Sequence, residues 1–155
     1  MVGNRLVNRA PLRKLGNAMG SIMSLMTQEV LAPYFGMHIP ELGALHAVEK
    51  LPGGQSNPTY KLSCDSGTYV LRAKPEGKLL KSAHMVEREF RVMQALAASD
   101  VAVPRMIHLA QEDQSPIGRA FFVMSYAEGR IFWDPALPDC TPSERAAIYD
   151  AMSAA

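Results

Sequence analysis

The order of apolar and polar residues predicts a β-sheet in the middle of the chain. Three short segments, residues 44–51, 59–64 and 68–74, are rich in β-branched and aromatic residues and are separated by the turn sequences PGGQSNP and DSG. Short apolar segments that follow one another through such turns are typical of hairpins. The pattern therefore predicts an antiparallel meander.

The two-residue period of a strand also assigns each side chain of this meander to a face. In the second strand, one face consists of Tyr60, Leu62 and Cys64. In the third strand, one face consists of Tyr69, Leu71 and Ala73, and the opposite face consists of Thr68, Val70 and Arg72. Arg72 is thereby predicted to leave the sheet on the face opposite to Leu71.

The period changes to that of a helix over residues 82–99, for which Ser82 is the predicted N-cap. At about 100° per residue, the apolar side chains gather in one stripe, and three charged residues lie outside it. The stripe consists of Val86, Phe90, Met93, Leu96 and Ala97, and the charged residues outside it are Glu87, Arg88 and Arg91.

Glu89 lies inside this stripe, between Met93 and Leu96. If the stripe packs on the sheet, the carboxylate is carried inward, and a buried carboxylate without a partner costs several kcal/mol. Arg72, on the preceding strand, is the nearest candidate cation. The alternative is that Glu89 lies at the edge of the stripe and extends into water, and the spacing does not choose between the two.

Two further strands are predicted at residues 105–111 and 119–127, which brings the sheet to five strands. Before the sheet, Thr27 is the predicted N-cap of a short helix that Pro33 and Gly36 interrupt. These elements predict an α+β fold in which one helix packs on a five-stranded antiparallel sheet.

A last helix is predicted after the sheet. It begins with Thr141 at the N-cap, Pro142 at the first helical position and Glu144 three residues after the cap, which is the pattern of a capping box.

Composition and charge limit the possible functions. The chain has 155 residues, of which 48% are hydrophobic and 20% charged, so it is long enough and apolar enough to form a globular core. Its formal net charge of +1 gives no general attraction to nucleic acid or acidic membranes, and no apolar run is long enough for a membrane span. Cys64 and Cys140 have no metal-ligand spacing, and we expect a reduced, cytoplasmic protein.

The first 26 residues differ from the rest of the chain because they carry basic but no acidic residues. The basic residues are Arg5, Arg9, Arg13 and Lys14. Such a segment resembles an organelle transit peptide, but Gly16 and Gly20 weaken its helix, and the alternative is a poorly ordered leader. We expect three parts: a leader at 1–26, a folded lobe at 27–130 and a further segment at 131–155.

Several segments together resemble a known family. They are GGQSNPTYKL, YVLRAKPEGKLLKSAHMVEREFRVMQAL, VPRMIHL and FFVMSYAEGRIFWDPALP. They are similar to the N-terminal half of the aminoglycoside phosphotransferase-type family, most of all to the branch associated with acyl-CoA dehydrogenases, and the resemblance runs from about residue 51 to the end. It implies a protein-kinase-like N-terminal lobe followed by the first helix of a truncated C-terminal lobe.

The resemblance implies a nucleotide site made of three parts. A glycine-rich loop would cover the phosphates, although its spacing also fits an ordinary hairpin turn. A cation on the third strand would hold the phosphates and an acid on the helix would orient it, while the backbone after the last strand would bind adenine. The implied residues are Gly53, Gly54, Gln55, Ser56 and Asn57 in the loop, Arg72 and Glu89 as the ion pair, and Met124, Ser125 and Ala127 in the hinge.

The resemblance also implies ATP as the phosphate donor, a small-molecule hydroxyl as the acceptor and Mg²⁺ as the metal ion. The family's catalytic loop needs an Asp with an Asn five residues on, yet after Asn57 the chain contains no asparagine. We therefore expect no catalytic residue in this chain, no activity of the chain alone, and the Mg²⁺ ligands in the missing C-terminal lobe. The alternative is a non-catalytic nucleotide-binding or interaction module that retains only this lobe.

The other candidate residues have simpler interpretations. The four histidines are scattered over different elements, and their spacing predicts no metal site. Phe132 and Trp133 could line a substrate entrance or pack the junction between lobes, and packing is the favoured interpretation.

Overall fold

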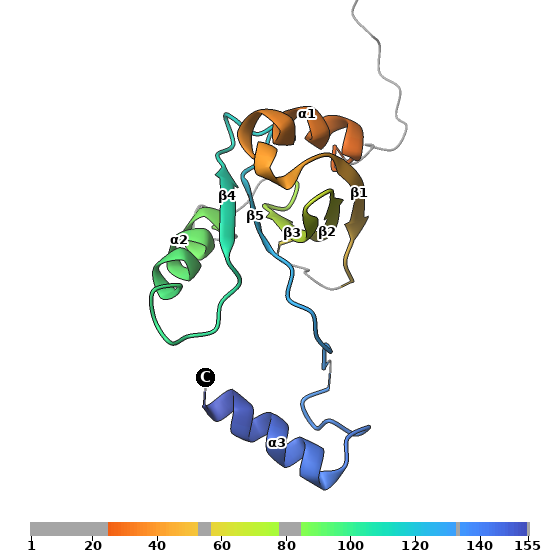
Figure 1. Ribbon diagram of the computed structural model, residues 1–155, viewed down its shortest axis with the longest axis vertical. Coiled ribbons are helices and arrows are strands. Elements are labelled where there is room, and N and C mark those ends of the chain that lie inside the picture. Colours follow the sequence, from red (N-terminus) through yellow and green to blue (C-terminus); the bar gives the residue numbers. More distant parts are fainter. Residues whose placement is uncertain (1–24, 53–56, 78–84, 133, 155) are drawn as a thin grey trace, which may run out of the picture.

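The computed structural model describes residues 25–52, 57–77, 85–132 and 134–154. The predictions for Gly53, Gly54, Gln55, Ser56 and Trp133 lie outside the described residues. Figure 1 shows the order of the elements along the chain. They are α1 (Gln28–His38), the 3₁₀ helix η1 (Pro40–Leu42), β1 (Leu45–Lys50), β2 (Thr59–Cys64), β3 (Gly67–Ala73), α2 (Val86–Leu96), β4 (Met106–Ala110), β5 (Phe121–Ser125) and α3 (Pro142–Ser153).

The five strands form a single antiparallel sheet in the order β1-β2-β3-β5-β4, which confirms the predicted architecture and the meander of the first three strands. The strand β3 is central, and Arg72 on it lies opposite Thr59 of β2 and Phe122 of β5. The sequence thus places a charged side chain on the middle strand of the sheet.

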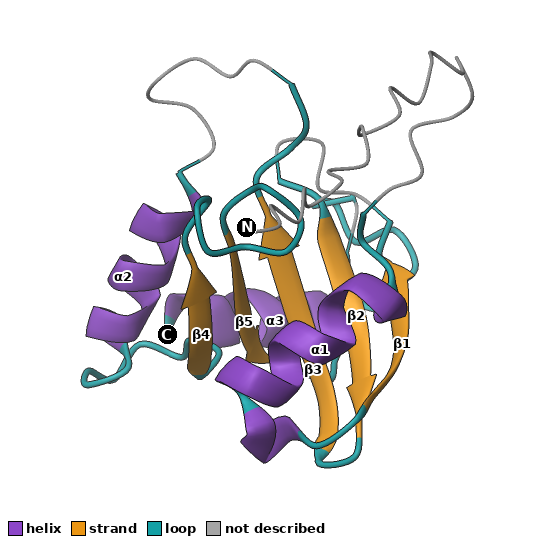
Figure 2. Cartoon of the chain, turned by 90° about the horizontal axis from the view of Figure 1, so that it is seen from above, coloured by secondary structure: helices purple, strands orange, loops and turns teal. Residues whose placement is uncertain are grey.

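The two faces of the sheet are covered by different helices. Figure 2 shows α1 lying across one face, whereas α2 lies beside β4. On the first face Leu31 and Phe35 of α1 join a core cluster that contains Leu71, and on the other Val86 and Phe90 of α2 cluster with Phe122. The run of consecutive apolar residues in β5 follows from this arrangement, because both faces of that strand are buried.

The predicted interruption of α1 is wrong, because the helix continues through Pro33 and Gly36. Both residues are exposed, while Leu31 and Phe35 on the other side are buried. A proline inside a helix costs about 3 kcal/mol, and each fully buried side chain of this size contributes about 1.5–3 kcal/mol. Packing against the sheet therefore offsets the lost hydrogen bond. Thr27 does occupy the N-cap position.

The predicted ends of α2 are also wrong. The helix begins at Val86 with Met85 as its N-cap, so Ser82, which lies outside the described residues, does not cap it, and it ends at Leu96 instead of residue 99. Periodicity identifies the apolar face of a helix but not its ends. Here the helix begins where its first apolar side chain, Val86, reaches the sheet.

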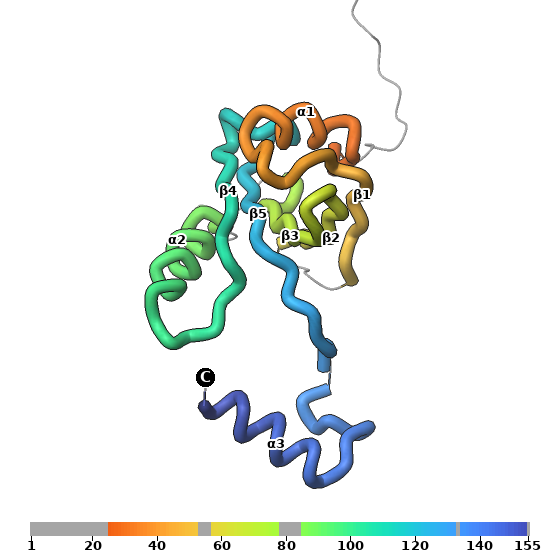
Figure 3. Tube along the Cα trace, viewed as in Figure 1, coloured from red at the N-terminus to blue at the C-terminus, as the bar shows by residue number. Residues whose placement is uncertain are grey.

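The predicted capping box of α3 is confirmed. The hydroxyl of Thr141 accepts a hydrogen bond from the N–H of Glu144, and the Glu144 carboxylate accepts one from the N–H of Thr141 at 2.8 Å. Among the described residues of α3 none is buried, and Figure 3 shows the chain running away from the sheet after β5 before it turns into this helix. No helix in the described ranges is long and apolar enough to cross a bilayer.

Within the described chain, the core includes a residue just before the predicted boundary at residue 27. Met26 is only 6% exposed and belongs to the core cluster on the α1 face of the sheet. The folded lobe thus includes one residue that the sequence assigned to the leader.

Candidate functional site

The structure brings Arg72 and Glu89 together. The Nε atom of Arg72 lies 3.2 Å from Oε1 of Glu89, and the two side chains are 32% and 31% exposed. Glu89 therefore turns toward the sheet as its place in the apolar stripe predicts, and the alternative that it extends into water is wrong.

The packing of α2 determines this geometry. The rings of Phe90 and Phe122 lie 6.0 Å apart, and Val86 is fully buried beside them. Glu89 is next to Phe90 on the helix, and Arg72 lies opposite Phe122 in the sheet. The contact between the two aromatic rings therefore places the carboxylate of Glu89 close to the guanidinium of Arg72.

The attraction between Arg72 and Glu89 is Coulombic, because the Nε–H of Arg72 is buried but not aligned for a hydrogen bond to the carboxylate. Among the described residues we find no hydrogen bond donated by this guanidinium. Its donors can therefore be offered to an anion, and arginine presents them as a planar fork that matches phosphate.

A second ion pair joins the same two elements, and the sequence did not predict it. Nζ of Lys74 donates to Oε1 of Glu87 at 2.5 Å, and these side chains are only 21% and 17% exposed. The helical period of the sequence placed Glu87 outside the apolar stripe. In the structure, however, the side chain of Glu87 is more buried than that of Glu89. The available signal was the spacing of Arg72 and Lys74, which lie two residues apart and therefore on one side of an extended chain.

Arg119 completes the charged cluster and was also not predicted. It donates from Nη1 to the backbone carbonyl of Lys74 at 3.2 Å and forms an ion pair with Glu76, also at 3.2 Å. Each cation of the cluster thus has an acidic partner, and the cluster carries no net charge.

The end of the predicted phosphate loop lies next to these strands. The N–H of Leu51 donates to the carbonyl of Thr59 at 2.9 Å. This hydrogen bond joins the two ends of the connection between β1 and β2, which contains the loop. Asn57, the one described residue among the five predicted for the loop, is 7% exposed, and its side-chain oxygen Oδ1 is buried with no hydrogen-bond partner among the described residues. A buried amide oxygen without a partner is uncommon and fits a site that a ligand completes.

The predicted hinge lies at the end of β5. Met124 is partly buried and lies opposite Val70 of β3 and Met106 of β4. The N–H of Ser125 donates to the carbonyl of Arg105 at 2.9 Å, so this N–H is not available to adenine. Ala127 follows the strand and is exposed.

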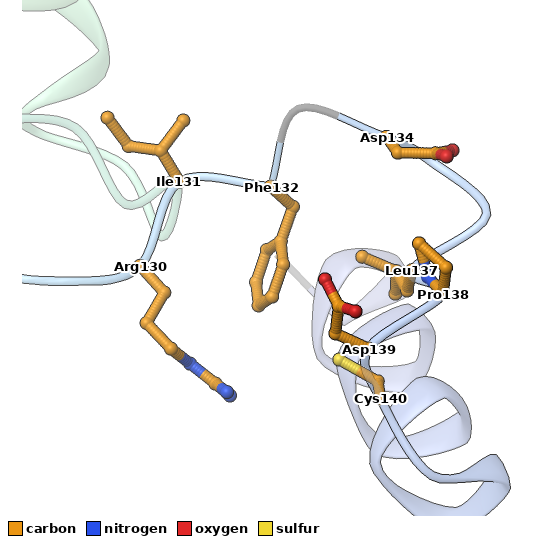
Figure 4. A pocket seen from close by; sticks show the side chains of 8 residues that line it. All are labelled: Arg130, Ile131, Phe132, Asp134, Leu137, Pro138, Asp139 and Cys140. Carbon is orange, nitrogen blue, oxygen red and sulfur yellow. The ribbon is translucent and has the colours of Figure 1, made fainter.

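A cavity of about 550 Å³ lies in the segment between β5 and α3, and the sequence did not predict it. Figure 4 shows the side chains around it, which are Arg130, Ile131, Phe132, Asp134, Leu137, Pro138, Asp139 and Cys140. Phe132 is 42% exposed and lies 5.1 Å from the guanidinium of Arg130. Packing of this ring at a junction between lobes remains a prediction.

The described histidines contact nearby side chains. His46 contacts Asp65 at 2.6 Å, and His108 contacts the hydroxyl of Tyr34 at 2.9 Å. In the part of the chain that the structure describes, no group of three His, Cys, Asp or Glu residues is placed to hold a metal ion.

The fold and the charged cluster define a class of protein. A five-stranded antiparallel sheet whose central strand carries a cation, paired with an acid from a packed helix, is the N-terminal lobe of a kinase-like fold. Residues 47–154 match the model of the phosphotransferase enzyme family, and the chain belongs to that family.

Relatives of known sequence and structure agree with this assignment. The chain is 53% identical over 100 residues to acyl-CoA dehydrogenase family member 10 of Mus musculus, which covers 64% of this chain and 9% of the relative. It is 44% identical over 123 residues to acyl-CoA dehydrogenase family member 11 of Rattus norvegicus, covering 77% of this chain and 16% of the relative. The chain thus spans a small part of these relatives.

A crystal structure from Ralstonia eutropha JMP134, named "putative aminoglycoside phosphotransferase", is also similar. It superposes with a TM-score of 0.60 at 47% sequence identity, covering 79% of this chain and 34% of that chain. The similarity extends the family assignment from sequence to fold.

Proposed function

We propose that this chain is the nucleotide-binding fragment of an ATP-dependent phosphotransferase that transfers the γ-phosphate to a hydroxyl group of a small molecule. The observation that carries the proposal is the partly exposed pair of Arg72 on the central strand and Glu89 on α2, in which the guanidinium donates no hydrogen bond to the described residues. The family assignment supports the reaction class.

Each part of the site has a role in this proposal. Arg72 would hold phosphate oxygens, and Glu89 would fix the direction of the guanidinium. The glycine-rich loop before Asn57 would present backbone N–H groups to the same phosphates. Met124 would line the adenine pocket, with the Ser125 carbonyl at the adenine edge. Ala127, beyond β5, would add a backbone N–H there.

The chemistry of transfer would be completed by other parts of the protein. When bound, ATP supplies the phosphoryl group, and Mg²⁺ neutralises the charge on its oxygens. Since no asparagine follows Asn57, we assign the catalytic Asp and the Mg²⁺ ligands to a part of the protein beyond this chain. The names of the relatives favour a hydroxylated acyl compound as the acceptor, by analogy.

Calorimetry with ATP tests the nucleotide site. Arg72→Ala should weaken ATP binding by about tenfold or more, which corresponds to at least about 1.4 kcal/mol, because a charge-assisted phosphate contact is lost. The matched control is Arg91→Ala, which removes an exposed cation from α2 and should leave the affinity unchanged. Absence of ATP binding by the unaltered chain would contradict the proposal.

The alternative, a non-catalytic nucleotide-binding module, is favoured by the lack of a catalytic Asp and Asn in this chain. The two proposals make different predictions for the DNA that follows codon 155. A phosphotransferase predicts that the encoding DNA beyond codon 155 continues into a loop with an Asp and an Asn five residues further. A frame that ends there in an intact genome would leave the module as the better proposal.

A further inference from the structure

Two ion pairs connect the end of β3 to α2, and only one of them includes the cation proposed for phosphate binding. Arg72 pairs with Glu89, and Lys74, two residues further along the extended chain, pairs with Glu87, two residues earlier on the helix. Lys74 continues the direction of β3, because its N–H donates to the carbonyl of Ala120 at 3.0 Å. The two cations therefore leave the chain on the same side.

The two acids lie on opposite flanks of the helix. Val86 and Phe90 are the buried side chains of α2 and mark the line along which it contacts the sheet. At about 100° per residue, Glu87 lies about 80° to one side of the middle of this line and Glu89 about 80° to the other. A rotation of α2 about its axis that moves Glu89 away from the sheet would therefore move Glu87 into it.

The Lys74–Glu87 pair is the firmer of the two attachments. Its atoms are closer, 2.5 Å against 3.2 Å, its side chains are less exposed, and it includes an aligned hydrogen bond, which Nε of Arg72 does not make. Its strand end is held as well, because Arg119 donates to the carbonyl of Lys74. Both Glu87 and Glu89 lie in the first turn of α2, so the helix dipole favours both carboxylates and does not account for the difference.

We propose that the Lys74–Glu87 ion pair is a positioning pair, which fixes the rotation of α2 and so holds Glu89 against Arg72. The apolar contact of Phe90 with Phe122 packs the helix on the sheet, and the Lys74–Glu87 pair sets its rotation. Arg72, which donates no hydrogen bond to the described residues, can then turn toward a phosphate while α2 stays in place. The inference rests on the proposed function in one respect, that Arg72 binds the nucleotide.

The first test compares ATP affinities by calorimetry. Glu87→Gln and Lys74→Met, which remove one charge at nearly constant volume, should weaken ATP binding by roughly three- to tenfold. Lys74→Arg keeps the charge and should retain the affinity, which a purely steric role would not explain. Glu112→Gln is the matched control, since it neutralises an exposed acid away from α2. ATP binding by Glu87→Gln at the affinity of the unaltered chain would overturn the inference and leave the proposed function intact.

The second test needs no nucleotide. If both pairs restrain one rotation, Glu87→Gln already weakens the Arg72–Glu89 contact, so the denaturant midpoint of the double variant Glu87→Gln/Glu89→Gln should shift by less than the sum of the single shifts. Additive shifts would overturn the inference. Should the unaltered chain fail to bind ATP, the proposed function fails, and this cycle still decides whether the pair positions α2.

Discussion

The imidazole of His108 connects β4 to α1. Its Nε2 atom lies 2.9 Å from the hydroxyl of Tyr34, whose ring stacks on that of His38 at 4.1 Å. Burial lowers the pKa of His108, the neighbouring His38 lowers it further, and Glu41 acts in the opposite direction. The folded protein thus binds a proton at this site more weakly than the unfolded chain does.

This difference predicts a pH dependence of stability. The contribution of His108 is present above its ordinary pKa of about 6.5 and is lost as the pH falls below that value, because the unfolded chain then gains a proton more readily. His108→Gln keeps a polar partner for Tyr34 but does not titrate. Its free energy of unfolding should therefore fall less between about pH 7.5 and about pH 5 than that of the unaltered chain, as measured by urea denaturation. Identical pH profiles would contradict the assignment.

The acidic residues of α2 show which site residues can be predicted from a sequence pattern and which cannot. Glu89 was identified because an acid inside an apolar stripe is conspicuous, and its partner Arg72 was a cation of the preceding strand on the correct face. Glu87 was missed because a helical wheel gives the direction of a side chain but not the reach of a lysine on the neighbouring strand. The two-residue spacing of Arg72 and Lys74 gave the side of the strand, but the reach of the lysine side chain has no counterpart in the period of the helix.

At the scale of elements, the contact between α2 and the sheet depends on Phe122. This side chain is fully buried and packs on Phe90. Phe122→Ala should lower the free energy of unfolding by about 3–5 kcal/mol, because it removes a buried ring and leaves a cavity. Phe132→Ala makes the same change at a half-exposed position and should cost less than about 0.5 kcal/mol in the same urea titration. Equal losses for the two variants would refute this account of α2.

The helix α3 depends on its cap more than on packing, since none of its described residues is buried. The Thr141 N–H and hydroxyl also hold the pKa of Glu144 below its ordinary range. Thr141→Ala should destabilise the helix by about 1 kcal/mol and reduce the far-UV circular dichroism signal while leaving the unfolding of the sheet unchanged. Thr27→Ala, at an N-cap whose side chain accepts no capping bond, is the control and should change the signal less.

The helices and strands could be predicted where interactions between residues close in sequence determine them. Short apolar segments bounded by turn residues located the five strands, and the capping box located α3, because both signals lie within a few residues. The ends of α2 and the continuity of α1 through Pro33 were not predictable, since contacts with a sheet distant in sequence determine them.

For the whole molecule, apolar side chains remain exposed on the segment between β5 and α3 and on α3 itself. They are Ile131 at 67%, Phe132 at 42%, Tyr149 at 48% and Met152 at 68%. Exposed apolar groups of this kind promote association, so the chain should self-associate as its concentration rises. Sedimentation velocity should show this, and the double variant Ile131→Lys/Met152→Lys should shift the chain toward monomer. A single monomer at every concentration would contradict the prediction.

The position of α3 relative to the sheet could not be predicted. The capping box specifies where this helix begins, but no buried side chain in its described part links it to the lobe, so no pattern could specify its placement.

The order of the strands has a consequence for biosynthesis. Every strand of the sheet lies between Leu45 and Ser125, and most strand pairings join neighbours in sequence. Short-range pairings favour fast folding, and domains generally fold as units during translation. The lobe can therefore assemble on the ribosome soon after residue 125 has left the exit tunnel, before any later segment is available to assist it.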